Sequence, residues 1–249
     1  MPSVFTITGS ITTFYIPFSS NYDLLIPSGS LNFEQSTNFN GILIVENANV
    51  NFYNQSTLQT LVMNGTGAVT FTSTQNIISD LLITGSPILN FKAQNSVPPV
   101  LNITNSFDWN SSGRSYVQTV TTQVGILNIA CTATATFISN SNLYLGVILN
   151  NYGKLIYTSN YVCMNSGAIV NQPNGVWYVN ISSNIPTNIS ECMGGVSTIT
   201  NYGEVFISNS DDFQIHVNFN NAGYLIILNG SLSLASGVTT HNGIFRSTF

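Results

Sequence analysis

The stretch 201–207 reads NYGEVFI, 221–227 reads NAGYLII and 241–245 reads HNGIF, so a glycine-led unit returns every twenty residues. Looser copies lie upstream, NYGKLIY at 151–157 and PNGVWYV at 173–179. The second residue after each glycine is apolar, and so is the fourth in the four upstream copies. Side chains two residues apart point to the same face of a strand. The repeat therefore predicts a strand with one buried face after each glycine.

The glycines of these units are expected to form structural corners. Glycine adopts a positive φ at a sharp corner without steric cost, and asparagine is the next most tolerant residue there. A second alternating segment, such as 214–219 or 231–236, follows within the unit. A repeat of about 20 to 50 residues is typical of a solenoid, in which each unit buries its apolar face against the next. The predicted corners are Gly153, Gly175, Gly203, Gly223 and Gly243.

The N-terminal half is less regular. Segments 41–45, 67–71 and 125–129 each begin with glycine and continue as a strand pattern. Two stretches, 92–115 and 182–195, are rich in proline, serine, asparagine or glycine and are predicted to be irregular insertions. No segment has helical periodicity with caps. We therefore expect one all-β domain, 1–249, with two insertions.

At the level of architecture, the glycine-corner units resemble the parallel β-helix proteins, which include filamentous adhesins, phage tailspikes and pectin lyases. The resemblance covers the units from Gly125 onward and extends to 41–91. It implies an all-β, right-handed parallel β-helix, or β-solenoid. The composition, poor in charge and rich in Asn, Ser, Thr, Tyr and Ile, also resembles virion and envelope proteins of acid-loving archaea. The alternative fold is an antiparallel β-sandwich or jelly roll.

Charge is scarce in this chain and excludes some classes of partner. Charged residues make up 5% of the sequence, against about 25% in an average soluble domain. The four basic residues, Lys92, Arg114, Lys154 and Arg246, are scattered, and the formal net charge is −5. Binding of nucleic acid or of an anionic membrane needs a basic patch. We therefore expect neither partner.

The sequence predicts that the protein lies outside the cell. No apolar run approaches the roughly 18 residues of a membrane span, so no membrane insertion is expected. The first residues carry no basic stretch of a signal peptide. We expect either that a signal has been removed or that the protein leaves the cell by assembly and lysis, as virion proteins do. The predicted location is extracellular or on a virion surface.

Three cysteines, Cys131, Cys163 and Cys192, form no CxxC pair and no metal-ligand spacing, so no zinc site is predicted. One interpretation is that they are buried free thiols. The other is a disulfide between Cys163 and Cys192. The sequence leaves both open.

Catalytic groups are sparse. Asp211 and Asp212 are adjacent and are predicted to lie in a solvated turn, although Glu191 or Glu204 could meet Asp211 across neighbouring coils to form a carboxylate pair. His216 has no Ser/His/Asp order and no nucleophile elbow around it. No catalytic, cofactor-binding or metal-binding residue is predicted, and the chain is not expected to be an enzyme or to hold a cofactor.

Tyrosines beside the corners offer a different function. Tyr152, Tyr202 and Tyr224 adjoin predicted corner glycines, and a row of exposed tyrosines there could stack on sugars. The alternative function is therefore a carbohydrate-binding or carbohydrate-cleaving β-helix protein. Glycans would then be a partner.

The last unit, 242–249, reads NGIFRSTF and brings no helix and no charge cluster. Terminal solenoid repeats normally carry a cap, because an open end is a template for pairing. Phe245 and Phe249 would lie near an open core, so this end is predicted to be an assembly interface. The leading function is a structural or attachment protein of a virion spike or fibre, or of a surface filament, assembled as an oligomer with copies of itself or with other virion or surface proteins.

Overall fold

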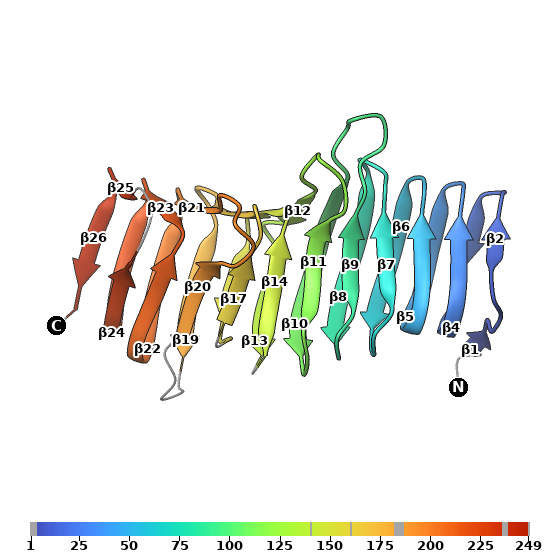
Figure 1. Ribbon diagram of the computed structural model, residues 1–249, viewed down its shortest axis with the longest axis horizontal. Coiled ribbons are helices and arrows are strands. Elements are labelled where there is room, and N and C mark those ends of the chain that lie inside the picture. The colour runs from blue at the N-terminus through green and yellow to red at the C-terminus, as the bar shows by residue number, and fades with distance from the viewer. Residues whose placement is uncertain (1–3, 140, 160, 182–186, 236–238, 249) are drawn as a thin grey trace.

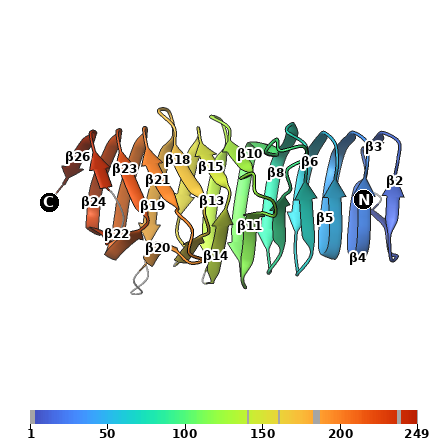
Figure 2. The ribbon, with the colours of Figure 1, turned by 45° about the horizontal axis from the view of Figure 1, so that its top comes forward.

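The computed structural model describes residues 4–139, 141–159, 161–181, 187–235 and 239–248. These residues form 26 strands, and no helix occurs among them. The strands make one continuous hydrogen-bonded sheet, and every pairing between named strands is parallel. The strands succeed one another along a rod from the N-terminus to the C-terminus (Figures 1 and 2). The arrangement is consistent with a β-solenoid, and the antiparallel sandwich expected as the alternative fold does not describe it.

The chain passes through three ladders of strands in turn, which we call the first, second and third faces. The first face contains β1 (Val4–Thr6), β13 (Thr134–Ser139), β16 (Lys154–Tyr157), β19 (Val176–Ile181) and β26 (Ile244–Ser247). The second contains β2 (Thr12–Phe14), β7 (Ala68–Phe71), β9 (Ile88–Phe91), β11 (Ser115–Thr119), β14 (Asn142–Gly146), β17 (Tyr161–Met164) and β20 (Thr187–Glu191). The third contains β3 (Phe18–Ser20), β12 (Ile126–Ile129), β15 (Ile148–Asn151), β18 (Ala168–Asn171), β21 (Thr198–Asn201), β23 (Asn218–Asn221) and β25 (Thr239–His241).

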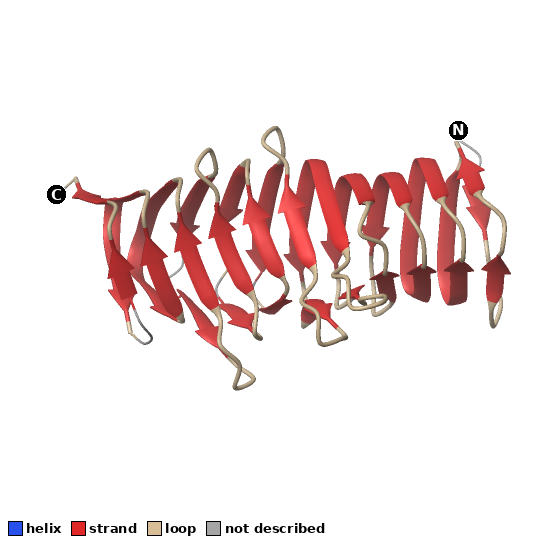
Figure 3. Cartoon of the chain, turned by 90° about the horizontal axis from the view of Figure 1, so that it is seen from above, coloured by secondary structure: helices blue, strands red, loops and turns tan. Residues whose placement is uncertain are grey.

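Seven longer strands bend from one face to the next without a break. They are β4 (Asp23–Phe33), β5 (Thr37–Phe52), β6 (Ser56–Met63), β8 (Asn76–Thr84), β10 (Val100–Ser111), β22 (Glu204–His216) and β24 (Tyr224–Leu234). Figure 3 shows the strands running across the rod, with loops gathered at its edges. The rod is therefore built mainly from paired strands.

The core lies inside the three faces because alternate residues of each strand point inward. One column on the first face pairs coil to coil from Leu24 to Leu225. Its inward side chains are each at most 5% exposed. They are Leu24, Leu43, Leu61, Leu81, Phe107, Ala135, Leu155, Trp177, Val205 and Leu225.

The N-terminal half is more regular than the sequence pattern indicated. Phe14, Phe33, Phe52 and Phe71 stack as a column on the second face, with centroid distances of 5.4, 5.1 and 5.1 Å between successive rings. Phe91 continues the column in register. Such near-parallel rings add to the free energy gained by burial. The missed signal was an apolar-x-Phe triplet that returns every 19 or 20 residues.

Strands occupy both stretches that were expected to be irregular insertions. β10 takes up half of 92–115, and its inward residues are buried. The turn before it holds Asn95 and Ser96 at φ of 50° and 61°, closed by an isolated bridge between Gln94 and Val97. β20 lies within 182–195, of which residues 182–186 lie outside the described residues. Within 92–115, proline and glycine therefore lie in the turns that flank β10.

The five predicted corner glycines do lie between the third and first faces, but the expected reason for them was wrong. None has φ in the left-handed region, which is adopted by Gly29, Gly65, Gly85, Gly194 and Gly230 instead. The reason is steric. A Cβ on Gly203 would overlap the carbonyl oxygen of Gly175, and one on Gly223 would overlap that of Gly203. The backbones of successive coils approach too closely here for any side chain.

A buried row of asparagines follows the third face just before those glycines. Asn151 Nδ2 donates to Asn171 Oδ1 over 2.8 Å, Asn171 to Asn201 over 2.8 Å, and Asn201 to Asn221 over 2.7 Å. All four are at most 2% exposed. Each of the first three also donates to a backbone carbonyl at the start of the first face, at 3.0–3.1 Å. This asparagine ladder ties each coil both to the next coil and to the next face.

A second row of amides runs on the outside of the same face. Asn128 Nδ2 donates to Asn102 Oδ1, and Asn150 Nδ2 donates to Asn128 Oδ1, each over 2.9 Å. These side chains are only half-buried. Amides thus provide the polar outer surface that charged residues provide in most proteins.

Candidate functional site

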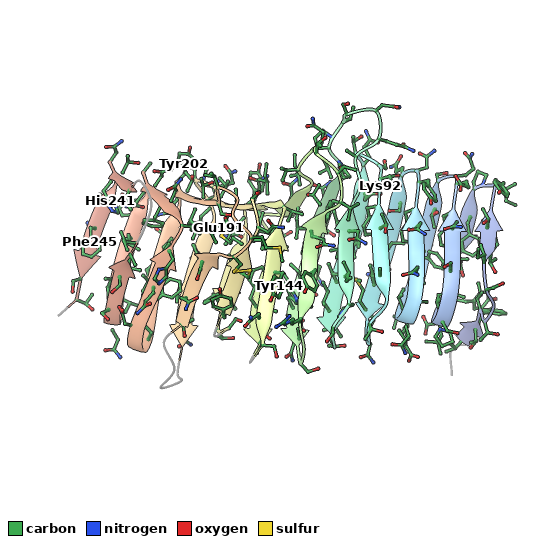
Figure 4. All side chains as sticks on the ribbon, viewed as in Figure 1. Lys92, Tyr144, Glu191, Tyr202, His241 and Phe245 are labelled. Carbon is green, nitrogen blue, oxygen red and sulfur yellow. A yellow bond between two sulfur atoms is a disulfide. The ribbon has the colours of Figure 1, made fainter. Side chains whose placement is uncertain are left out.

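The two ends of the rod expose the core column of the first face. Phe5 pairs with Leu24 and Phe245 with Leu225, so both phenylalanines belong to the inward column. Phe5 is 55% and Phe245 58% exposed. Figure 4 labels Phe245 on the last coil. Phe249, the other residue predicted at this end, lies outside the described residues.

An apolar groove of about 250 Å³ crosses the outside of the first face. The Tyr178 and Phe206 rings stack at 5.2 Å between centroids, and Lys154 Nζ lies 5.0 Å from the Tyr178 centroid. Leu228, which is 45% exposed, borders the groove on a later coil. The Tyr178 ring thus has Phe206 and Lys154 against it, so it offers no free face on which a sugar could stack.

The three corner tyrosines do not form one continuous row. Tyr152 and Tyr202 occupy the same position in their coils, but the coil between them has Gln172 there. Tyr224 stands in another column, paired with Glu204 and Ile244. All three tyrosines are exposed. The expected continuous tyrosine surface is absent from this described stretch.

Asp212 is bound within a polar network on the outside of the second face. Ser231 and Ser233 donate to its carboxylate at 2.9 and 2.8 Å, and Gln214 Nε2 donates at 3.0 Å. Gln214 Oε1 lies 3.0 Å from His216 Nε2. Desolvation raises the pKa of Asp212, but the three hydrogen bonds outweigh it and hold the pKa below its ordinary value of 3.8. With three donors to one carboxylate, this network has a structural role, in which the Asp212 side chain of β22 binds the serines of β24.

The acids considered for a carboxylate pair lie at different places. Glu204 is the first residue of β22, on the first face. Glu191 is the last residue of β20, on the second face, and pairs with Met164. Asp212 lies within β22 rather than in a turn, and the side chain of Asp211 lies outside the described part of the chain. His216 and Glu191 border one small pocket at the end of the second face.

Cys163 and Cys192 are joined by a disulfide, with their Cα atoms 5.5 Å apart. The bond fastens the segment after β20 to β17 in the preceding coil. Cys131 is a free, exposed thiol rather than a buried one. Tyr161 lies beside the bond, with its hydroxyl 3.0 Å from Cys192 Sγ.

Within the described ranges, no group of three or more His, Cys, Asp or Glu side chains is placed to hold a metal ion. No helix there is long and apolar enough to cross a membrane. Comparison with protein-family models, with curated proteins and with solved structures finds no match to this chain. The fold and surfaces therefore define the protein as a parallel-stranded, charge-poor β rod with apolar ends.

Proposed function

We propose that this protein is a structural or attachment component of a virion spike or fibre, or of an extracellular surface filament. It assembles as an oligomer, with copies of itself or with other surface proteins as partners. The observation that carries the proposal is the inward column of the first face, which continues to Phe5 at one end and Phe245 at the other. Both rings are more than half exposed. Another polypeptide strand laid on either end would bury them.

The ladders along the rod support a mechanical role. Parallel pairing, stacked phenylalanines and buried asparagines link each coil to its neighbours in the same direction. In such repeat proteins the free energy of folding is close to a sum of one term for each repeat and one for each contact between neighbouring repeats. A rod of this kind can therefore be stable at any length. A rod of this kind keeps two surfaces at a fixed separation. On the handedness rule for parallel crossovers, we further propose that the coil is right-handed.

The assembly proposal is tested by sedimentation of variants on the last strand. Phe245→Asp places a charge on the inward column, while Ile244→Asp places the same charge on the outward side of β26. We expect the intact chain and Ile244→Asp to associate as concentration rises, and Phe245→Asp to remain a monomer. Circular dichroism checks that each variant keeps its β structure.

Two results would count against this function. The intact chain could remain a monomer at the highest soluble concentration, or Phe245→Asp could associate as strongly as Ile244→Asp. In either case the exposed column is no interface. Electron microscopy of native material then serves as the independent measurement, because a fibre or spike component is found in particles or filaments with defined symmetry.

A further inference from the structure

The outer surface of the first face is apolar in its C-terminal half. Every second side chain of a strand points outward, and one outward column there continues from coil to coil through Ile156, Tyr178, Phe206 and Ile226. Beside this column, Ile138 is 46% and Leu228 45% exposed. An apolar patch on the outside of a protein is typical of a surface that binds another molecule.

Four charged side chains lie in the two outward columns of this half, and they are placed symmetrically about β19. Lys154 and Glu204 occupy one column, one strand before and one strand after β19. In the other column, Asp108 stands three strands before Tyr178, and Arg246 stands three strands after it. Each positive charge therefore has a negative charge at the same number of strands on the other side of β19.

This arrangement is complementary to itself. In a two-fold contact, a residue that meets a second residue of the other copy is met by that copy in return. A copy turned over about an axis along β19 would place its Glu204 on Lys154 and its Arg246 on Asp108. No other axis along the described strands of this face sets both basic residues opposite an acid in the same column.

The same rotation matches the apolar side chains. Ile156 would meet Phe206 of the second copy, and Tyr178, on the axis, would meet its own counterpart. Ile138 on β13 and Leu228 on β24 stand two strands on either side of β19 and would also meet. The groove of the first face, which is lined by four of these five residues, would be closed by the second copy.

The fold leaves the charges of this surface available. Within the described residues, the side chains of Asp108, Glu204 and Arg246 have no hydrogen-bond or ion-pair partner. Asp80, which lies outside the symmetric set, instead accepts hydrogen bonds from Asn105 and Ser106, each over 2.6 Å. The unpartnered charges are therefore the ones that a second copy would pair.

We propose that a second copy of this chain binds the outer surface of the first face, antiparallel to the first copy, on a two-fold axis along β19. This contact goes beyond the end contacts proposed above, because it joins rods side by side. One such contact is weak, since ion pairs exposed to solvent contribute little. Rods that are also joined end to end hold many such contacts at once, so that their side-by-side pairing is strengthened.

The test is cross-linking with a carbodiimide, which joins a lysine amine to a carboxylate in contact with it as an amide. Lys154→Gln keeps the carboxylate of Glu204 but lacks the amine, and Glu204→Gln keeps the amine but lacks that carboxylate. In a mixture of the two variants, an amide between positions 154 and 204 can form only between copies. Both variants also carry Phe245→Asp, so that the rod ends do not associate and the covalent dimer reports the side contact alone.

We expect the mixture to give at least about ten times more covalent dimer than either variant alone, with the amide located at Lys154 and Glu204 by mass spectrometry. Adding Ile138→Asp to both variants should lower the yield at least about fivefold, because it places a charge in the apolar contact. The matched control is Ile77→Asp, at an isoleucine that is 37% exposed on the outside of the third face. Its yield should stay within about twofold.

The proposal is overturned if the mixture gives no more dimer than the single variants, or if Ile77→Asp lowers the yield as much as Ile138→Asp. The rod-end contact is judged separately, by the concentration-dependent association of the intact chain. Covalent dimer in the mixture together with an intact chain that does not associate end to end would count against the rod-end contact and support the side contact.

Discussion

At the scale of single residues, the corner glycines illustrate how a correct position can have a different physical cause from the one expected. The repeat located Gly203 between two strands, and the sequence suggested a positive φ there. The structure has ordinary backbone at this position and places the carbonyl oxygen of Gly175 where a Cβ would be. How closely the backbones at Gly203 and Gly175 approach each other depends on how the two coils stack, and a local sequence pattern does not encode this.

Gly203→Ala is therefore expected to destabilise the protein by about 1–3 kcal/mol, because the methyl group forces stacked backbones apart. The matched control is Gly9→Ala, since a Cβ at Gly9 has nothing within 4 Å and its φ is not in the left-handed region. The control should be neutral or slightly stabilising. Urea unfolding of both variants measures the difference. Equal midpoints for the two would show that coil spacing at Gly203 adjusts freely.

At the scale of elements, the asparagine ladder joins β15, β18, β21 and β23 through their last residues. Three residues of the asparagine ladder, Asn151, Asn201 and Asn221, are the asparagines of the Asn-x-Gly motif. The sequence pattern suggested that they favour a turn. The fourth, Asn171, lies four residues before Gly175, so the motif placed Pro173 at the ladder position of that unit. Only the register of β18 with β21 identifies the correct residue.

Asn201→Leu is expected to lower the free energy of unfolding by about 3–5 kcal/mol, since it leaves neighbouring buried donors and acceptors without partners. The groups that would lose their hydrogen bond to Asn201 are Asn171 Nδ2, Asn221 Oδ1 and the Tyr224 carbonyl. Thr200→Val, on the outward side of the same strand, should change stability by less than about 1 kcal/mol. Thermal and urea unfolding provide the measurement. A loss in Asn201→Leu no larger than in Thr200→Val would mean that the ladder contributes no net stability.

At the scale of the whole molecule, scarcity of charge predicts weak dependence of stability on pH. The chain has nine carboxylic acids and two histidines. Stability changes with pH only where folded and unfolded states bind different numbers of protons. Asp212 is a carboxyl whose pKa is lowered in the fold. A lowered pKa means that its contribution is present at neutral pH and is lost as pH falls below the ordinary value of 3.8 and through the folded pKa.

We therefore expect the melting temperature to change by less than about 15 °C between about pH 7 and pH 3, with the decline confined to the acid end. Asp212→Asn should flatten that decline, because the residue can no longer take up a proton. Calorimetry across the pH range measures both. A larger fall, or a fall centred near neutral pH, would mean that other buried acids or histidines dominate.

The sequence by itself determined the all-β class and the positions of the corners, because these follow from local alternation and from a period of about twenty residues. The structure decided between parallel strands and the antiparallel alternative. The tertiary structure decided which side chains meet across coils. Asn171 and Asn201, and likewise Glu191 and His216, come from units of unequal length, so their meeting depends on register rather than on spacing. In a parallel rod, each difference in loop length changes which residues of neighbouring coils lie side by side. This register is a property of two neighbouring coils, so the sequence of one coil does not determine it.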